Sequence, residues 1–145
     1  MDAERQLGVS DTVCVANLGP RSDQGVVMLS EAEFMAGLFA MWMEPDVAVR
    51  RTAIEAHFHS DVRFHDPDGE FVGYEGLERF SDSLQSRFPG ARFTLARQPQ
   101  RLGDAIRAYW TFGPPAKPAA VSGMDFIILS EDRARTLYAF VDIDS

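Results

Sequence analysis

Two aspartates stand where an alternating strand would point them toward the protein interior. Asp66 ends the run Val62-Arg63-Phe64-His65-Asp66, in which residues 62, 64 and 66 share one face because side chains alternate across a strand. Asp125 begins the apolar run Asp125-Phe126-Ile127-Ile128-Leu129. A buried carboxylate without a partner is costly, so such an acid is paired, takes up a proton or takes part in chemistry. Two inward acids in one small domain therefore indicate acid–base chemistry.

Each aspartate also has a structural explanation. Asp66 precedes Pro67-Asp68-Gly69, a turn sequence in which an aspartate accepts hydrogen bonds from backbone N–H groups. Asp125 could be a buried acid satisfied by an arginine such as Arg107 or by a backbone N–H. If both line one cavity, Asp66 could accept and return a proton while a neutral Asp125 donates a hydrogen bond. The residues alone leave both explanations open.

Two helices are predicted before Asp66. A capping box at Ser30 and apolar residues at helical spacing predict a helix that ends before Glu44-Pro45. A second helix is expected from Asp46 to about Phe58. Its inner side is expected to carry Val47, Ile54 and Phe58, with Arg50-Arg51 outside.

A third helix is predicted from about Glu75 to Phe88, where Pro89-Gly90 ends it. After it the apolar period changes to two, which predicts strands around Phe93 and Leu95, over 106–112, over 120–129 and from about Arg135 to Val141. This order indicates an α+β fold, with three helices against one face of a highly curved antiparallel sheet. Such a cone-shaped fold would enclose an apolar pocket. We expect five residues to line it: Trp42, Phe64, Trp110, Phe112 and Ile127.

Composition limits the other classes of protein. A chain of 145 residues fits one domain, here residues 30–145, and residues 1–29 are predicted to be an N-terminal extension that is partly disordered. A net charge of −8 argues against nucleic-acid binding. The lone Cys14 gives no disulfide framework, and no apolar stretch approaches the roughly 20 residues of a membrane span. Without a secretory signal at the start, the sequence favours a cytoplasmic protein.

The histidines do not predict a metal site. His57 and His59 are two residues apart and so do not face each other on a helix, and His65 alternates away from Asp66. No nucleophile elbow, phosphate loop or dinucleotide fingerprint is present in the sequence. Tyr138 alternates away from Leu137, so we expect it to face the helices or a partner subunit.

Several short motifs follow one another in a recognisable order. They are Phe64-His65-Asp66-Pro67-Asp68-Gly69, Gly73-Tyr74-Glu75-Gly76-Leu77, Arg87-Phe88-Pro89-Gly90, Tyr109-Trp110-Thr111-Phe112-Gly113, Ser122-Gly123-Met124-Asp125-Phe126 and Leu137-Tyr138-Ala139-Phe140-Val141-Asp142. This order resembles the nuclear transport factor 2-like superfamily, in its SnoaL-like polyketide cyclase and ketosteroid isomerase branch. The resemblance covers about residues 30 to 142.

The resemblance implies a cone-shaped fold with an apolar cavity for a small apolar molecule, a homodimer that pairs through the sheet, and no cofactor. Asp66 matches the proton-shuttling base of ketosteroid isomerases, and Asp125 matches their protonated second acid. Those isomerases also use a tyrosine on the first helix, where this chain reads Gly37-Leu38-Phe39-Ala40-Met41-Trp42. The resemblance therefore does not extend to steroid isomerisation itself.

Three functions are compatible with these residues. The first is a cofactor-independent isomerase, cyclase or dehydratase acting on a small apolar carbonyl compound, with Asp66 and Asp125 catalytic. The second resembles limonene epoxide hydrolase, with Arg107 or Arg97 between the two aspartates to activate water. The third is a non-catalytic small-molecule-binding or dimerisation module, because one fold hosts many functions. An enzyme requires both carboxyl groups to face one accessible cavity.

Overall fold

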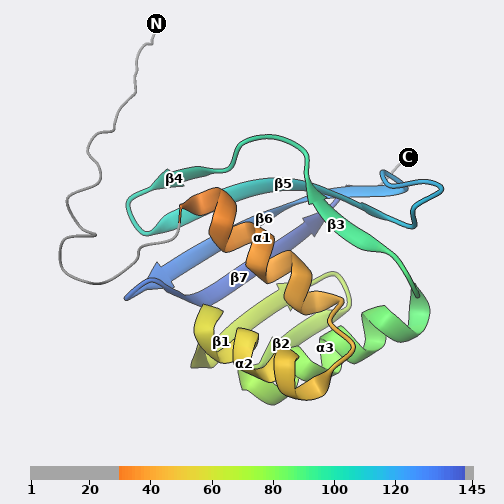
Figure 1. The fold of residues 1–145 in the computed structure, drawn as a ribbon. Coiled ribbons are helices and arrows are strands. Elements are labelled where there is room, and N and C mark those ends of the chain that lie inside the picture. The colour runs from red at the N-terminus through yellow and green to blue at the C-terminus, as the bar shows by residue number, and fades with distance from the viewer. Residues whose placement is uncertain (1–29, 143–145) are drawn as a thin grey trace, which may run out of the picture. The chain divides into compact units, whose positions relative to one another are not determined.

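The computed structural model describes residues 30–142, and the extension predicted for residues 1–29 lies outside them. The described chain forms three helices and seven strands (Figure 1). In chain order they are α1 (Glu31–Trp42), α2 (Val47–His57), β1 (Phe58–Asp66), β2 (Gly69–Val72), α3 (Gly73–Arg87), β3 (Arg92–Leu95), β4 (Gln100–Leu102), β5 (Ala105–Gly113), β6 (Val121–Ser130) and β7 (Arg133–Val141).

The strands form one sheet in the order β2-β1-β7-β6-β5-β3, with β4 also paired to β5. Neighbouring strands are antiparallel with one exception, because β1 and β7 run parallel. The sequence did not predict this pair, since it joins the first and last strands of the fold. The α+β class with a curved sheet against three helices is otherwise confirmed.

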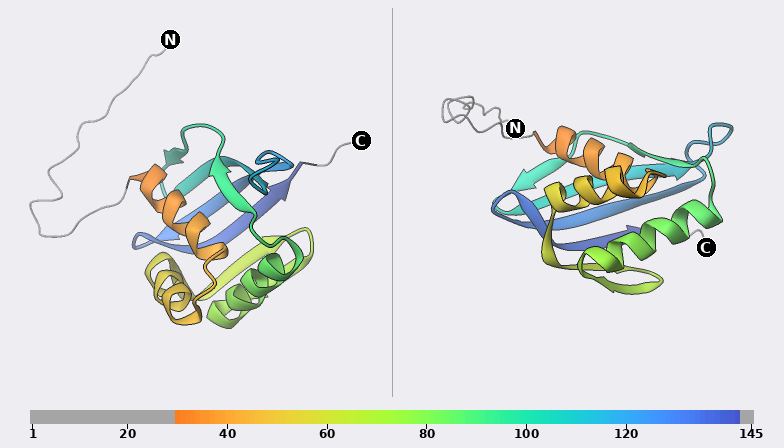
Figure 2. Two further views of the ribbon diagram at one scale, coloured as in Figure 1. Left: turned by 45° about the vertical axis from the view of Figure 1, so that its right-hand side comes forward. Right: turned by 60° about the horizontal axis from the view of Figure 1, so that its bottom comes forward.

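The helices cover the two ends of the inner face of the sheet. Helix α1 contacts β3 at one end, and α3 contacts β1 and β2 at the other (Figures 1 and 2). The central strands β5, β6 and β7 carry their inner side chains between these helices. This arrangement places residues from most elements of the fold around one interior space.

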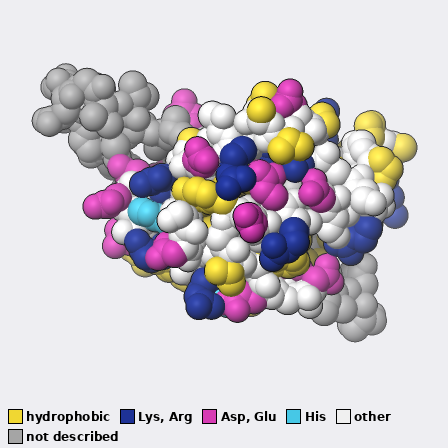
Figure 3. All heavy atoms as spheres, turned by 90° about the horizontal axis from the view of Figure 1, so that it is seen from below, with side chains coloured by type: hydrophobic (Ala, Val, Ile, Leu, Met, Phe, Trp, Pro, Cys, Tyr) yellow, Lys and Arg dark blue, Asp and Glu magenta, His cyan; other side chains and the backbone are white. Residues whose placement is uncertain are grey.

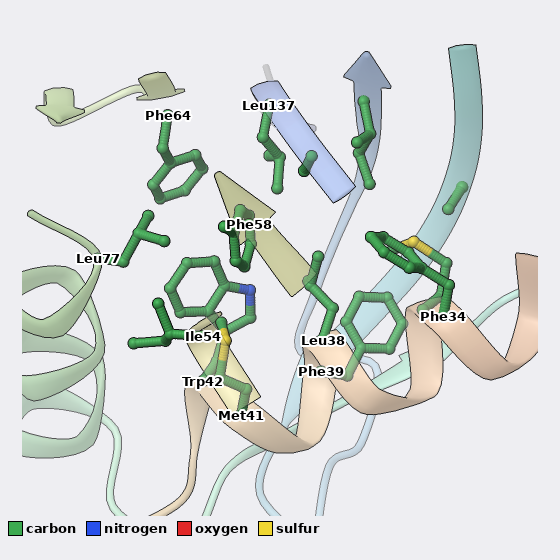
Figure 4. Packing of buried hydrophobic residues seen from close by; sticks show 14 of the residues in the cluster. Phe34, Leu38, Phe39, Met41, Trp42, Ile54, Phe58, Phe64, Leu77 and Leu137 are labelled. Carbon is green, nitrogen blue, oxygen red and sulfur yellow. The ribbon is translucent and has the colours of Figure 1, made fainter. Parts of the chain in front are cut away.

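The helix ends follow the sequence closely. The Asp46 carboxylate caps α2 by accepting hydrogen bonds from the N–H groups of Ala48 and Val49, at 2.9 and 3.1 Å. The apolar stripe of α1 is buried as predicted and packs into an aromatic and aliphatic core, in which Trp42, Phe58 and Phe64 lie close together (Figure 4).

Helix α2 corrects one prediction. Val47, expected inside, is 61% exposed, whereas Arg50, expected outside, is only 2% exposed. The Arg50 guanidinium is buried because α3 supplies its partners. Its Nε lies 2.6 Å from Glu78 Oε1, its Nη2 lies 2.9 Å from Asp82 Oδ1, and its Nη1 lies 3.2 Å from Ser81 Oγ.

The face seen from below in Figure 3 mixes acidic and basic side chains with small apolar patches. Within residues 30–142, no helix is long and apolar enough to cross a membrane.

Candidate functional site

A cavity of about 310 Å³ lies in the interior of the curved sheet. Its wall is mostly apolar. Asp125 lies deep in this wall, Asp66 lies at its edge, and Asp68 and Arg87 form an ion pair at the rim. The residues that line it are Trp42, Phe64, Asp66, Pro67, Asp68, Phe80, Leu84, Arg87, Phe88, Phe93, Trp110, Phe112, Val121, Asp125, Leu137, Ala139 and Val141. Both aspartates predicted from the sequence therefore face the same space.

Asp125 lies on the inner face of β6 and is 5% exposed. Its Oδ1 accepts a hydrogen bond of 3.0 Å from the indole Nε1 of Trp110 on β5. Burial raises the pKa of Asp125 from 3.8 to about 7; the Trp110 hydrogen bond opposes this rise, and the nearby Asp66 charge adds to it. Because an indole N–H can only donate, a proton on this carboxyl group belongs on Oδ2.

Gly123 provides the space that the Trp110 indole needs. The two residues are cross-strand partners on β5 and β6. A Cβ atom at position 123 would lie 2.4 Å from Trp110 Cζ2 and 2.3 Å from the Phe140 carbonyl oxygen. The missing side chain thus lets the indole lie over the strand and reach Asp125, two residues farther along β6.

Asp66 lies at the rim of the cavity, where β1 turns into β2. Its backbone pairs with Gly69 across a two-residue turn, and its Oδ1 accepts a hydrogen bond of 2.7 Å from the N–H of Asp68. The turn interpretation of Asp66 is therefore correct, and the turn also leaves the half-buried carboxylate facing the cavity. Burial raises the pKa of Asp66, partly offset by the Asp68 N–H; the Asp68 charge raises it further and Arg87 lowers it.

The two acids titrate in sequence. Asp66 ionises first because its carboxyl group is only half-buried, whereas Asp125 is fully enclosed. Asp125 is still neutral at that stage, and it later loses its proton against the negative charge of Asp66. Between these two steps the pair consists of one carboxylate, Asp66, and one carboxylic acid, Asp125.

The predicted lining residues Trp42, Phe64, Trp110 and Phe112 are all on the cavity wall. Ile127 is the exception: it is completely buried in the core and does not line the cavity. The reason is its position on β6, one inward position beyond Asp125 and about 7 Å farther along the strand.

The arginines suggested for water activation are also placed elsewhere. Arg97 and Arg107 are exposed, with the Arg97 guanidinium 3.7 Å from the ring centroid of Tyr109. Tyr109 and Arg107 alternate with the buried Ala108 and Trp110, so this cluster lies on the outer face of the sheet. Neither arginine stands between the two aspartates. Tyr138 is likewise on the outer face, where its ring stacks on His65.

Sequence reasoning missed Arg87 and the aromatic residues Phe88 and Phe93. Arg87 Nη2 lies 3.2 Å from Asp68 Oδ2, across the rim of the cavity. Phe93 packs edge-on against Trp110 with ring centroids 5.2 Å apart. The Arg87-Phe88-Pro89-Gly90 motif was the available signal, but only the fold brings the end of α3 next to the turn after β1.

The described residues contain no cluster of three His, Cys, Asp or Glu side chains suited to a metal ion. His57 is used in packing: its Nδ1 hydrogen-bonds the Ala53 carbonyl at 2.9 Å, and its ring contacts Phe34. The cavity brings together a carboxyl group that can accept a proton, Asp66, a buried carboxyl group that can donate a hydrogen bond, Asp125, and an aromatic wall. This set suits proton transfer at a carbon next to a carbonyl group.

Comparison with known proteins gives a family match. The family model described as "SnoaL-like domain" matches residues 35–136, which is most of the chain and contains both aspartates. No curated protein matches the chain.

Solved structures share the fold. A candidate isomerase of the SnoaL-like family from Agrobacterium tumefaciens is 27% identical, with a TM-score of 0.70 over 76% of this chain and 95% of that one. A protein with a ketosteroid isomerase-like fold from Catenulispora acidiphila, in complex with trimethylamine, is 16% identical, with a TM-score of 0.64 over 80% and 90%. A candidate polyketide cyclase from Sinorhizobium meliloti is 13% identical, with a TM-score of 0.57 over 73% and 92%.

Proposed function

Because this chain belongs to the SnoaL-like domain family, we propose that it is a cofactor-independent enzyme that moves a proton within a small, mostly apolar carbonyl compound. The observation that carries the proposal is that Asp66 and Asp125 face one apolar cavity. The reaction would be an isomerisation, an aldol-type cyclisation or a dehydration. All three begin by forming an enol or enolate.

Asp66 is the base in this proposal. Its carboxylate takes a proton from the carbon next to the substrate carbonyl, and the C–H electron pair becomes the new C=C bond. The carbonyl π electrons move to oxygen, where the Oδ2–H of Asp125 donates a hydrogen bond to the developing charge. In an isomerisation the Asp66 proton is then returned to another carbon, so atoms and electrons balance.

The hydrogen bond from Trp110 supports this division of roles. It occupies Oδ1 of Asp125 and leaves the protonated Oδ2 for the substrate oxygen. Apolar surroundings strengthen such a hydrogen bond because little water competes for it. The active protonation state is the singly protonated pair, so activity should fall as pH rises past about 7 and Asp125 ionises.

Exchange of α-hydrogens tests the proposal without knowledge of the product. A panel of aromatic and alicyclic ketones in D₂O, followed by NMR, should show faster deuterium uptake with the protein than with buffer. Asp66→Asn should abolish the acceleration, and Asp125→Leu, which removes the hydrogen-bond donor, should reduce it about 10²- to 10³-fold. Asp61→Asn, which changes an exposed aspartate on β1, is the control and should keep the full rate. A rate that Asp66→Asn leaves unchanged would refute the assignment of the base.

A non-catalytic binding function is the second candidate. Aromatic rings and a carboxylate around one space also suit a small organic cation, and the Catenulispora acidiphila protein was crystallised with trimethylamine. In this case added trimethylammonium should lower the pKa of Asp125, because the cation stabilises its charged form. A neutral ketone bound as the enzyme proposal requires would instead favour the protonated acid.

A further inference from the structure

We infer that Asp68 and Arg87 are positioning residues that hold the Asp66 carboxylate toward the cavity. The inference rests on the proposed function in one respect, namely that Asp66 acts as the base. Its geometric part, a chain of contacts from α3 to Asp66, does not depend on any substrate.

The chain of contacts has two links. The backbone N–H of Asp68 donates to Asp66 Oδ1 at 2.7 Å, and Arg87 Nη2 donates to Asp68 Oδ2 at 3.2 Å. The first link fixes one oxygen of the base and so sets the direction of the other. The second link ties the turn that carries Asp68 to the last residue of α3. Together they connect the base to the end of α3, about 20 residues later in the chain.

Arg87 is itself held at the cavity wall. Its guanidinium carbon lies 5.3 Å from the ring centroid of Phe88, and Phe88 packs edge-on against Phe112 at 5.6 Å. Both aromatic rings line the cavity. Among the described residues that line this cavity, Arg87 is the single cation. Its position therefore makes it part of the site rather than of the general surface.

Three charged or titratable groups face Asp66. The Asp68 carboxylate raises the pKa of Asp66, the Arg87 guanidinium lowers it, and Asp125 across the cavity is neutral while Asp66 titrates. Arg87 thus offsets part of the unfavourable effect of burial and of Asp68. The Arg87 and Asp68 side chains are 46% and 57% exposed, so salt will weaken the charge effect but not the backbone hydrogen bond.

The test is an NMR titration of the Asp66 carboxyl group, combined with hydrogen exchange of the Asp68 amide, in the full chain. Arg87→Met should raise the pKa of Asp66 and speed exchange of the Asp68 amide. Arg87→Lys should keep the pKa near that of the wild type, because the charge remains. Asp68→Asn should lower the pKa of Asp66, since it removes a like charge and keeps the backbone donor.

Arg79→Met is the matched control. Arg79 lies on the same helix, is exposed and is eight residues, or about 12 Å, from Arg87. It should change neither readout. If Arg87→Met gives the same Asp66 titration and the same Asp68 exchange as Arg79→Met, the inference is wrong. Failure of every ketone to exchange its α-hydrogens would instead count against the proposed function alone, because these readouts use no substrate.

Discussion

At the scale of single residues, the proposed function requires one acid that is charged and a neighbour that is neutral. Asp66 is at the rim, where the Asp68 N–H and Arg87 favour its ionised form. Asp125 is enclosed, and among residues 30–142 its single charge-stabilising contact is the Trp110 indole. The difference in burial, rather than any difference in residue type, separates the two roles.

Asp125 should make the stability of the protein depend on pH. Its pKa is about 7 in the folded state against 3.8 as the ordinary value, so the folded state holds one more proton between these pH values. Stability should therefore be greatest at low pH within this window and fall as pH rises through 7. At about 1.4 kcal/mol per pKa unit, the loss is on the order of 4 kcal/mol. Asp66 contributes in the same direction.

Urea unfolding of wild type and Asp125→Asn at pH 5 and pH 8 measures this effect. The wild type should lose stability between the two pH values, and Asp125→Asn should lose much less. Asp61→Asn removes an exposed carboxylate and should keep the wild-type difference. Equal pH dependence in wild type and Asp125→Asn would mean that Asp125 is charged throughout this range.

At the scale of elements, Arg50 shows where the sequence stops being informative. The helical period of α2 was clear, but the two candidate sides of that helix both carry apolar residues. What decides between them is Glu78, Ser81 and Asp82 on α3, about 30 residues later. Arg50 also donates from Nη1 to the Glu44 carbonyl at 3.3 Å, so α3 and the turn after α1 share one buried network.

The same reasoning explains which of the other predicted positions were correct and which were wrong. Alternation within one strand correctly placed Phe64, Trp110 and Phe112 inward, because alternation is a local property of a strand. It could not distinguish Asp125 from Ile127, because both lie on the inner face of β6 and differ in their position along the strand. The β1–β7 pair joins strands whose neighbours are set by the whole fold, and the Trp110–Asp125 hydrogen bond depends on the register between β5 and β6.

Breaking the Arg50 network should cost more than removing a surface charge. Arg50→Met leaves Glu78, whose side chain is 14% exposed, without its close partner at 2.6 Å. Loss of one member of a buried ion pair typically costs about 3–5 kcal/mol. Arg51→Met removes the neighbouring charge, whose side chain is 40% exposed and reaches Glu78 only at 3.5 Å, and should cost less than about 1 kcal/mol. Urea unfolding compares the two, and equal losses would show that burial of Arg50 adds nothing to stability.

At the scale of the whole molecule, the helices leave the outer face of the sheet without a covering element among residues 30–142. Apolar side chains from two neighbouring strands meet there, because Met124 pairs with Phe140 and Phe126 pairs with Tyr138. Phe140 is 55% exposed and Tyr138 is 37% exposed. Adjacent exposed aromatics of this kind are typical of protein–protein contacts.

A homodimer through this face, which the family resemblance predicted, remains a proposal and can be tested directly. Sedimentation of the wild type should show a dimer. In thermal unfolding, the melting temperature should rise with protein concentration. Phe140→Glu should give a monomer, because it places a charge in the centre of the apolar contact. Val47→Glu, at a similarly exposed apolar position on α2, should remain dimeric. A wild type that is monomeric at all concentrations would contradict the proposed dimer.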